Sequence, residues 1–346
     1  MAGAQAREAG PSRAPAAGGP ALRLDPAFVR SLERVASVRE DEPLSRHTTI
    51  GIGGPADAFV TVRSNLQLAS VLGLCHRAGQ PVFVLGSGSN IVAGDRGIRG
   101  VVIDNQAQSL EGPFPIAGGG PRTADPSAND EAFLFRADAG CSFAGVSRQL
   151  ASAGYAGLEW ACGIPGTIGG AVVYNAGAYG GCLGDVLLRV GVWDPEAGET
   201  VYEARDLAMV YRGSAFTRGL MAGRAVLWAE FVLWRGDTEA LKARVAEYDA
   251  RRLKAQPRGR NAGSFFKNPA SRPAWKLIDD VGLRGFRIGG AQFSEKHCNF
   301  LVNAGGATAA NVAALKRLAE ARVRETFGVD LEAEVSLVGE GFGDEA

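Results

Sequence analysis

The sequence predicts an α+β fold made of two or three domains, and three observations lead to this prediction. The chain has 346 residues, a length that can bury a large core and commonly divides into more than one domain. Segments with helical periodicity alternate with short apolar runs that are typical of strands. Residues 58–85 have the order strand, helix, strand, which packs a helix against a sheet.

The composition excludes several classes of function. The chain has 37 basic and 37 acidic residues and zero formal net charge, whereas a nucleic-acid or membrane surface needs a basic excess or a basic stripe. No apolar run reaches the length of about 18 residues that spans a bilayer. The five cysteines form no CxxC pair, and they are few and odd in number, which does not suit a disulfide framework. We therefore expect reduced thiols, a cytoplasmic location and no nucleic-acid or membrane partner.

The first segment is expected to be a disordered tail. Residues 1–24 are rich in Ala, Gly and Pro, contain no aromatic residue and lack the uninterrupted apolar segment of a signal peptide. A short helix is predicted to begin at Asp25 and Pro26, because proline is favoured in the first turn. We interpret the charged residues 39–43 as a flexible link.

A loop of small residues, which includes Thr49 and Gly51, precedes a predicted half-buried strand at 58–62. By itself this loop fits a ligand contact and a hairpin turn equally well. The sequence does not decide between the two.

A second small-residue loop follows a predicted helix at 65–78 and a predicted buried strand at 82–85. It offers hydrogen-bond donors without bulk, and its residues are Gly86, Ser87, Gly88, Ser89 and Asn90. A strand that opens into such a loop is a common way for a sheet to meet a phosphate. The loop is not a Rossmann fingerprint, because the third glycine and the later acidic residue are missing, and it lacks the lysine of a P-loop.

The most glycine-rich stretch is residues 157–181. Gly163, Gly166, Gly169 and Gly170 would allow main-chain amides to approach a ligand without a Cβ in the way, and Glu159 is the only charged residue of the stretch. The alternative is a buried glycine-rich turn. Two such loops about seventy residues apart would suit one long ligand, such as a dinucleotide, in a groove between subdomains.

The remaining segments alternate between strands and helices. Residues 111–130 are dominated by Gly, Pro, Ala, Ser and Asp, which predicts a flexible surface insertion. Strands are predicted at 133–137, 186–192, 200–202 and 226–234, with helices at 142–152 and 238–252. The last part is a separate unit, with helices at 274–280 and 311–327 and strands at 300–302 and 331–338.

Three polar residues could carry chemistry. Ser264 follows Gly263 on a tight turn and could protonate a strongly basic carbanion or enolate, although a structural turn serine is the alternative. A hydrolase triad is disfavoured, because there is no G-x-S-x-G motif and His297 is the only histidine in this part of the chain.

Arg212 could bind a carboxylate or form a salt bridge. Glu334 would share one face of a strand with Glu332, and both could be solvated.

Six motifs, in order along the chain beyond residue 25, resemble those of the UDP-N-acetylenolpyruvoylglucosamine reductase family, known as MurB. They are HTTIGIGGPAD at 47–57, LGSGSN at 85–90, GLEWACGIPGTIGGAVVYNAGAYG at 157–180, YRGSAF at 211–216, GSFFKNP at 263–269 and LEAEV at 331–335. One such motif would be weak, whereas six in this order are specific. The chain is similar to the shorter form of the family, which lacks an inserted tyrosine-bearing loop, because only 51 residues separate Arg212 from Ser264.

The resemblance implies a FAD-binding fold of the PCMH/VAO type with two α+β subdomains, followed by an α/β substrate-binding domain. On this basis we place the FAD-binding domain at 25–225, with subdomains at about 25–103 and 104–225, and the substrate-binding domain at 226–340. FAD would be bound non-covalently, and no metal is expected. The implied cofactor-binding residues are Thr49, Gly51, Gly86, Ser87, Gly88, Ser89, Asn90, Gly163, Gly166, Thr167, Gly169, Gly170, Ala171 and Asn175.

The implied reaction is the reduction of UDP-N-acetylglucosamine enolpyruvate to UDP-N-acetylmuramate, a step of peptidoglycan precursor synthesis. NADPH would reduce the flavin, and hydride would then pass from flavin N5 to C3 of the enolpyruvyl group. Arg212 and Glu334 would stabilise the charge of the enolate, and Ser264 would protonate C2. The implied contacts to the UDP-sugar are Lys254, Lys267 and Asn268.

Two alternatives stay open beside this resemblance. Another FAD oxidoreductase of the same architecture would generally have a larger cap domain than the roughly 110 residues here, and often a histidine bound to the flavin; His47 and His76 are the only candidates. A nucleotide-sugar binding protein without catalysis would have no use for Arg212, Ser264 and Glu334 together. We expect small molecules as the only partners and a monomer.

Overall fold

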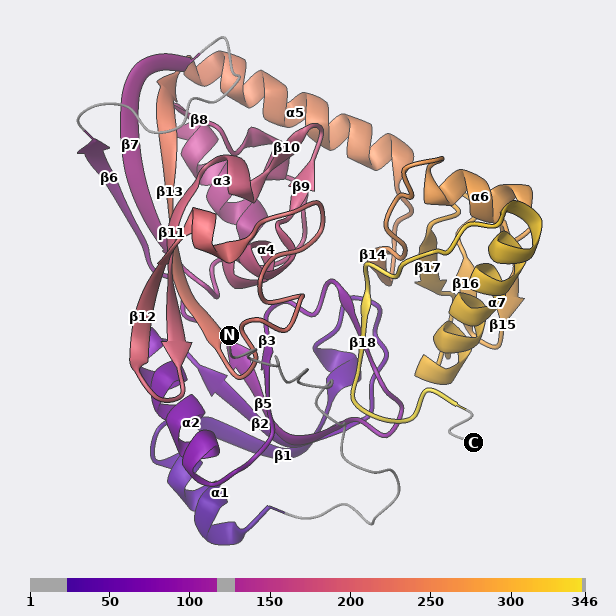
Figure 1. The fold of residues 1–346 in the computed structure, drawn as a ribbon, viewed down its shortest axis with the longest axis horizontal. Coiled ribbons are helices and arrows are strands. Elements are labelled where there is room, and N and C mark those ends of the chain that lie inside the picture. The colour runs from indigo at the N-terminus through magenta and orange to yellow at the C-terminus, as the bar shows by residue number, and fades with distance from the viewer. Residues whose placement is uncertain (1–23, 117–127, 344–346) are drawn as a thin grey trace, which may run out of the picture.

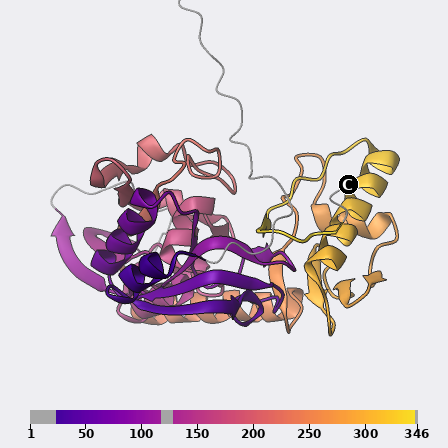
Figure 2. The same ribbon diagram turned by 90° about the horizontal axis from the view of Figure 1, so that it is seen from below.

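Figure 1 shows the computed structural model of the protein, which describes residues 24–116 and 128–343. The predicted tail therefore lies outside the described residues, apart from Leu24, and so does the centre of the predicted insertion at 117–127. Three units are visible: two that lie against each other and a C-terminal unit set to one side of both, as Figure 2 also shows. The predicted α+β fold is confirmed.

The first subdomain is built on a four-stranded sheet with the order β1-β2-β5-β3. Strands β2, β5 and β3 are parallel, and β1 pairs with β2 in the antiparallel sense. The chain crosses from β2 to β3 through helix α2, which begins where the Ser64 side chain accepts a hydrogen bond from the amide of Gln67. The elements are α1 (Pro26–Glu33), β1 (Ser37–Pro43), η1 (Leu44–Arg46), β2 (Pro55–Val62), α2 (Asn65–Arg77), β3 (Val82–Leu85) and β5 (Ile98–Asn105).

Strand β1 corrects one expectation. Residues 39–43 were expected to be a flexible link, but they belong to β1, which pairs with β2 along the length of β1. A charged segment can form a strand at the edge of a sheet, because its side chains remain exposed while its backbone groups are paired. Of these residues, only Glu42 is buried.

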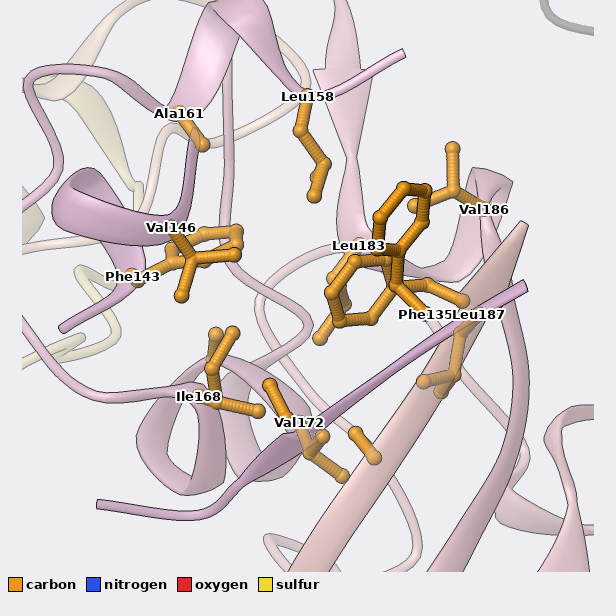
Figure 3. Packing of buried hydrophobic residues seen from close by; sticks show 14 of the residues in the cluster. Phe135, Phe143, Val146, Leu158, Ala161, Ile168, Val172, Leu183, Val186 and Leu187 are labelled. Carbon is orange, nitrogen blue, oxygen red and sulfur yellow. The ribbon is translucent and has the colours of Figure 1, made fainter. Parts of the chain in front are cut away.

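The second subdomain is a larger antiparallel sheet with the order β12-β11-β13-β7-β6, in which β8 also pairs with β13. Helices α3 and α4 cover one face, and Figure 3 shows how Phe135, Phe143, Ile168 and Val172 pack between helices and sheet. The elements are β6 (Leu110–Ile116), β7 (Ala128–Asp138), α3 (Phe143–Ser152), β8 (Tyr155–Ala156), η2 (Glu159–Ala161), α4 (Ile168–Tyr174), β9 (Gly177–Ala178), β10 (Gly181–Cys182), η3 (Leu183–Asp185), β11 (Leu187–Asp194), β12 (Gly198–Glu203), η4 (Ala204–Leu207) and β13 (Ala225–Gly236).

Two predicted boundaries differ from this arrangement. Strand β13 was assigned to the C-terminal domain, but it lies between β11 and β7, and its first ten residues are buried. A strand covered on both faces belongs to the sheet that surrounds it, so the second subdomain extends to Gly236. Both ends of the predicted insertion are also ordered as strand, because residues 110–116 form β6 and residues 128–130 begin β7.

Helix α5 (Thr238–Ala255) leads from the second subdomain to the C-terminal unit and forms the long bridge at the top of Figure 1. This unit has a four-stranded sheet in the order β14-β17-β16-β15, covered by α7. Its elements are β14 (Asn261–Ser264), α6 (Ala274–Asp280), β15 (Arg287–Ile288), β16 (Ala291–Phe293), β17 (Phe300–Asn303) and α7 (Ala309–Phe327). The predicted helices at 274–280 and 311–327 are confirmed.

The end of the chain returns to the first subdomain. Strand β18 (Ser336–Val338) pairs in parallel with β4 (Ile91–Ala93), the strand that directly follows the loop at 86–90. Only this part of the strand predicted at 331–338 forms a regular strand, and Glu334 lies just before it. The carboxylate of Asp95 also accepts hydrogen bonds from the amides of Ala309 and Ala310, at 2.7 and 3.0 Å, at the start of α7. Both contacts hold the C-terminal unit to the first subdomain.

Candidate functional site

A cavity of about 680 Å³ lies where the three units meet. Its walls include the loop at 86–90 from the first subdomain, most of residues 164–178 from the second and residues 262–264 from the C-terminal unit. Arg212, Ser264 and Glu334 all line it. The structure thus brings the three predicted catalytic residues to one cavity with both glycine loops, although they are far apart in the sequence.

The loop at 86–90 can bind an anion through its backbone. The amides of Ser87, Gly88 and Ser89 have no acceptor among the residues that the structure describes. Gly88 has a φ of 62°, and a Cβ there would lie 2.1 Å from the carbonyl oxygen of His47, so no other residue fits. Free amides around a position without side-chain bulk fit the diphosphate of FAD.

The second glycine loop meets the first directly. The Ser89 hydroxyl donates to the carbonyl of Pro165 at 3.0 Å, and a Cβ at Gly86 would lie 2.6 Å from Oγ1 of Thr167. Gly166, Thr167, Gly169, Gly170 and Ala171 line the cavity. The amide of Gly169 is already used, since it donates to the carbonyl of Ala139 at 2.8 Å. The contribution of this loop is therefore the shape of the cavity wall more than free amide donors.

Four residues predicted to bind the cofactor do not line this cavity. The amide of Thr49 donates to the carbonyl of Gly88, and its hydroxyl donates to the carbonyl of Asn261, while Gly51 lies against Arg260. These two residues join the first subdomain to the C-terminal unit. The other two, Gly163 and Asn175, have different structural tasks.

Asn175 holds the loop that carries Arg212. It ends α4 with a positive φ of 43°, accepts a hydrogen bond from the amide of Gly184 and donates to the carbonyl of Val210 at 3.0 Å. Arg212 also has a positive φ, 53°, which is uncommon for a residue with a side chain. Such strain persists only where the surrounding structure fixes the backbone, and Asn175 contributes to that.

Arg212 and Glu334 form an ion pair inside the cavity. Nε of Arg212 lies 2.9 Å from Oε1 of Glu334, without the alignment of a good hydrogen bond. Burial raises the pKa of Glu334 above its usual range, while the positive charges of Arg212 and Lys267 lower it. A carboxyl group in this position can change its protonation state when a second anion approaches Arg212.

Ser264 is the last residue of β14, and its backbone pairs with Phe300. The following residues, Phe265 and Phe266, are fully buried and fix the turn. Within the described part of the chain, the Ser264 hydroxyl has no hydrogen-bond partner. It is therefore free to donate to a ligand in the cavity.

The three residues predicted to contact the UDP-sugar lie outside the cavity lining. Lys254 is exposed in the last turn of α5. Nζ of Lys267 lies 2.5 Å from the carboxylate of Glu332, and the side chain of Asn268 accepts a hydrogen bond from the amide of Ala274 at the start of α6. Of the three, Lys267 influences the site from outside the cavity lining, because its positive charge lowers the pKa of Glu334.

Sequence reasoning missed Arg252, which does line the cavity. Arg252 is half-buried, and the structure shows no hydrogen bond or ion pair from its guanidinium to any residue in 24–116 or 128–343. Burial lowers the pKa of its guanidinium. Gly163 makes room for it, since a Cβ there would lie 2.6 Å from Cδ of Arg252. A signal was available, because Arg252 continues the helical stripe of Leu241, Val245 and Tyr248 that faces inward.

His297 is the only histidine of the C-terminal unit. The structure places it between Trp275 and Phe300, with Nδ1 accepting a hydrogen bond from the amide of Asn299, and it does not line the cavity. Burial lowers its pKa below the usual range for histidine. It packs the C-terminal unit.

Comparisons with known proteins agree with this arrangement. One family model, described as UDP-N-acetylenolpyruvoylglucosamine reductase, C-terminal domain, matches residues 255–338, and a second, described as FAD binding domain, matches residues 56–202. The chain is 41% identical over 310 residues to the UDP-N-acetylenolpyruvoylglucosamine reductase of Heliobacterium modesticaldum, covering 88% of this chain and 91% of that one. It is 43% identical over 310 residues to the enzyme of the same name from Desulfosudis oleivorans, covering 88% and 95%.

A solved structure is similar as well. The crystal structure of UDP-N-acetylenolpyruvylglucosamine reductase from Thermus caldophilus is 34% identical, with a TM-score of 0.68, and the match covers 87% of this chain and 99% of that one. The similarity thus extends over the FAD-binding and the C-terminal parts together.

Proposed function

Because the chain belongs to the UDP-N-acetylenolpyruvoylglucosamine reductase family, we propose roles for its cavity residues in the reaction of that family. The reaction is the NADPH-dependent reduction of UDP-N-acetylglucosamine enolpyruvate to UDP-N-acetylmuramate through FAD, in peptidoglycan precursor synthesis. When bound, FAD supplies the hydride chemistry. The amides of Ser87, Gly88 and Ser89 would hold its diphosphate, since they are free and no side chain blocks them.

Arg212 would bind the carboxylate of the enolpyruvyl group. Apart from its ion pair with Glu334, its guanidinium makes no hydrogen bond within the described chain, so its terminal NH₂ groups can hold a carboxylate in a bidentate manner. As negative charge spreads onto that carboxylate in the transition state, the fixed positive charge stabilises it. Glu334, with its raised pKa, can hold a proton beside this charge.

Ser264 would deliver the proton to C2. A serine hydroxyl is a weak acid, but transfer from it is favourable when the acceptor is a strongly basic carbanion or enolate. The side chains of Phe265 and Phe266 are buried behind it and keep water away from that side.

Arg252 would contact the diphosphate of the UDP-sugar. Its half-buried guanidinium has lost part of its hydration and has no ion-pair partner among the described residues, so it can bind an anionic group of a ligand in the cavity. Lys254, Lys267 and Asn268, predicted for this role, would then act indirectly or at the entrance.

We also propose that the protein is a cytoplasmic monomer and that small molecules are its only partners. One chain supplies every residue named above, and the balanced net charge gives no reason for attraction to a polyanion. None of the helices that the structure describes is long and apolar enough to cross a bilayer. Light scattering during size-exclusion chromatography tests the monomer, and a dimer mass would contradict it.

The observation that carries the proposal is the Arg212 and Glu334 ion pair beside a free Ser264 hydroxyl, in one cavity with the loop at 86–90. The test is a spectrum of the FAD-loaded protein under anaerobic conditions. NADPH should bleach the flavin absorbance, and UDP-N-acetylglucosamine enolpyruvate should restore it. A flavin that NADPH bleaches but the enolpyruvyl compound does not restore would contradict the proposal.

A further inference from the structure

Residues 333–336, here called the crosspiece, join parts of the chain that are distant in sequence. The amide of Glu334 donates to the carbonyl of Phe265 at 2.8 Å, and its carbonyl accepts from Nδ2 of Asn90 at 3.0 Å. The amide of Ser336 donates to the carbonyl of Asn90, also at 3.0 Å. The Ser336 hydroxyl lies 2.6 Å from the hydroxyl of Tyr174, at the end of α4.

These contacts fix Glu334 from both sides. On one side is Phe265, the neighbour of Ser264; on the other is Asn90, the last residue of the loop whose amides face the cavity. Of these two contacts to the Glu334 peptide, only the one from Asn90 uses a side chain, so only that one can be removed without altering the backbone. Pairing of β18 with β4 begins immediately afterwards, with Ser336 opposite Ile91.

We propose that Asn90 is a positioning residue for the substrate half-reaction. Its amide sets Glu334, and through the ion pair also Arg212, at a fixed place relative to the cofactor loop and to Ser264. This inference rests on the proposed function, and it gives a residue of the glycine loop a task other than cofactor binding. Catalytic groups are sensitive to such placement, because a displacement of 1 Å can reduce a rate by about 10²-fold.

The side chain of Asn90 could instead serve only to hold the units together. The chain offers a matched control for that possibility. Nδ2 of Asn303 donates to the carbonyl of Ile50 at 3.0 Å, which is likewise a bond from an asparagine amide to a backbone carbonyl between the C-terminal unit and the first subdomain. Asn303 does not line the cavity.

The experiment compares Asn90→Ala with Asn303→Ala, both saturated with FAD. Stopped-flow absorbance measures separately the reduction of the flavin by NADPH and its reoxidation by UDP-N-acetylglucosamine enolpyruvate. For Asn90→Ala we expect reoxidation at saturating substrate to slow about tenfold or more, with reduction by NADPH within about twofold of the unaltered protein. Asn303→Ala should leave both rates unchanged and lower only the Tm.

A second measurement needs no cofactor. Hydrogen exchange of the apo-protein, followed by mass spectrometry over residues 331–338, should be faster in Asn90→Ala and unchanged in Asn303→Ala, because only the first loses a contact to the crosspiece. If Asn90→Ala does not fold, Asn90→Asp keeps the size of the side chain while it replaces the donor with an oxygen that repels the Glu334 carbonyl. It should show the same selective loss.

Three results would overturn the inference: equal effects of the Asn90 and Asn303 variants on reoxidation, parallel slowing of both half-reactions by Asn90→Ala at saturating FAD, or unchanged exchange of residues 331–338. Failure of the proposed function looks different. In that case the unaltered protein itself would not be reoxidised by the enolpyruvyl compound.

Discussion

The two ends of the cavity are built in different ways. The end that we propose for the cofactor, at residues 86–90 and here called the cofactor end, presents backbone amides from one short segment and needs small residues more than particular side chains. The end that we propose for the substrate, here called the substrate end, consists of Arg212, Ser264 and Glu334, side chains from three segments that only the fold brings together. A backbone site is therefore specified locally, and it fails when a Cβ is added. A side-chain site depends on long-range contacts, and it fails when one group or its support is removed.

The largest effect is expected at the substrate end, from Ser264→Ala. Loss of the proton donor should slow reoxidation of the flavin by the enolpyruvyl substrate by roughly 10³-fold, since general acid catalysis contributes on that order. Stopped-flow absorbance should show reduction by NADPH unchanged, because the cofactor end is not altered. Ser271→Ala, an exposed serine of the same unit, serves as the control. Equal slowing of both half-reactions would contradict separate tasks for the two ends.

At the cofactor end, Gly88→Ala should weaken FAD binding by about tenfold or more, a change of about 1.4 kcal/mol per tenfold. The alanine would combine an unfavourable φ of 62° with a Cβ 2.1 Å from the His47 carbonyl oxygen. Gly79→Ala is a matched control, because Gly79 has the same φ with nothing within 4 Å of the added Cβ. Fluorescence titration with FAD measures both. If the two variants bind FAD equally well, the close approach of the Gly88 backbone to the His47 carbonyl is not what shapes the site.

Arg252→Met tests whether this half-buried cation belongs to the substrate end. We expect KM for the enolpyruvyl substrate to rise by on the order of tenfold or more, with little change in kcat, because a hydrogen-bonded charge is lost in both ground and transition state. The same variant should change the Tm little, since the half-buried guanidinium makes no ion pair within the described chain. Arg251→Met, an exposed position that pairs with Glu247, should change neither quantity. A lowered Tm with an unchanged KM would show that Arg252 only supports the fold.

The smallest effect is expected from His297, which lies in the same unit but outside the cavity. Burial lowers its pKa in the folded protein, so the unfolded chain takes up a proton first as the pH falls below about 6.5. Stability should therefore decrease over that range, and His297→Gln should remove part of the decrease, by about 2 °C in Tm or less. Differential scanning calorimetry from pH 7.5 to 5 measures it. A KM that changes with this variant at constant pH would instead place His297 at the substrate end.

The sequence predicted well the features that depend only on residues close together in the chain, and the cofactor end is one of them. The predicted helix at 274–280 has the observed bounds of α6, and the loop at 86–90 lies in the cavity as expected. Roles that depend on distant partners were harder to predict. Strand β13 was placed in the wrong domain because its pairing with β11 and β7 is invisible in the sequence. The charged strand β1 was taken for a link for the same reason.

Residues of the substrate end were also hard to predict, because their positions depend on the fold. Lys254 was chosen as a contact to the UDP-sugar, whereas Arg252, two residues earlier, faces the cavity. Two residues along a helix are about half a turn, which separates an inward from an outward position, so the choice depends on helical register more than on residue type. Asn175 was expected to bind the cofactor, but its side chain supports the loop of Arg212 through Val210. The catalytic roles of Arg212, Ser264 and Glu334 stay predictions until they are measured.

A crystal structure of the protein loaded with FAD and soaked anaerobically with UDP-N-acetylglucosamine enolpyruvate would test the division of the cavity most directly. We expect the FAD diphosphate on the amides of Ser87, Gly88 and Ser89, the substrate carboxylate on Arg212, and the Ser264 hydroxyl facing C2. A diphosphate bound away from the loop at 86–90, or a substrate carboxylate that does not contact Arg212, would contradict the account.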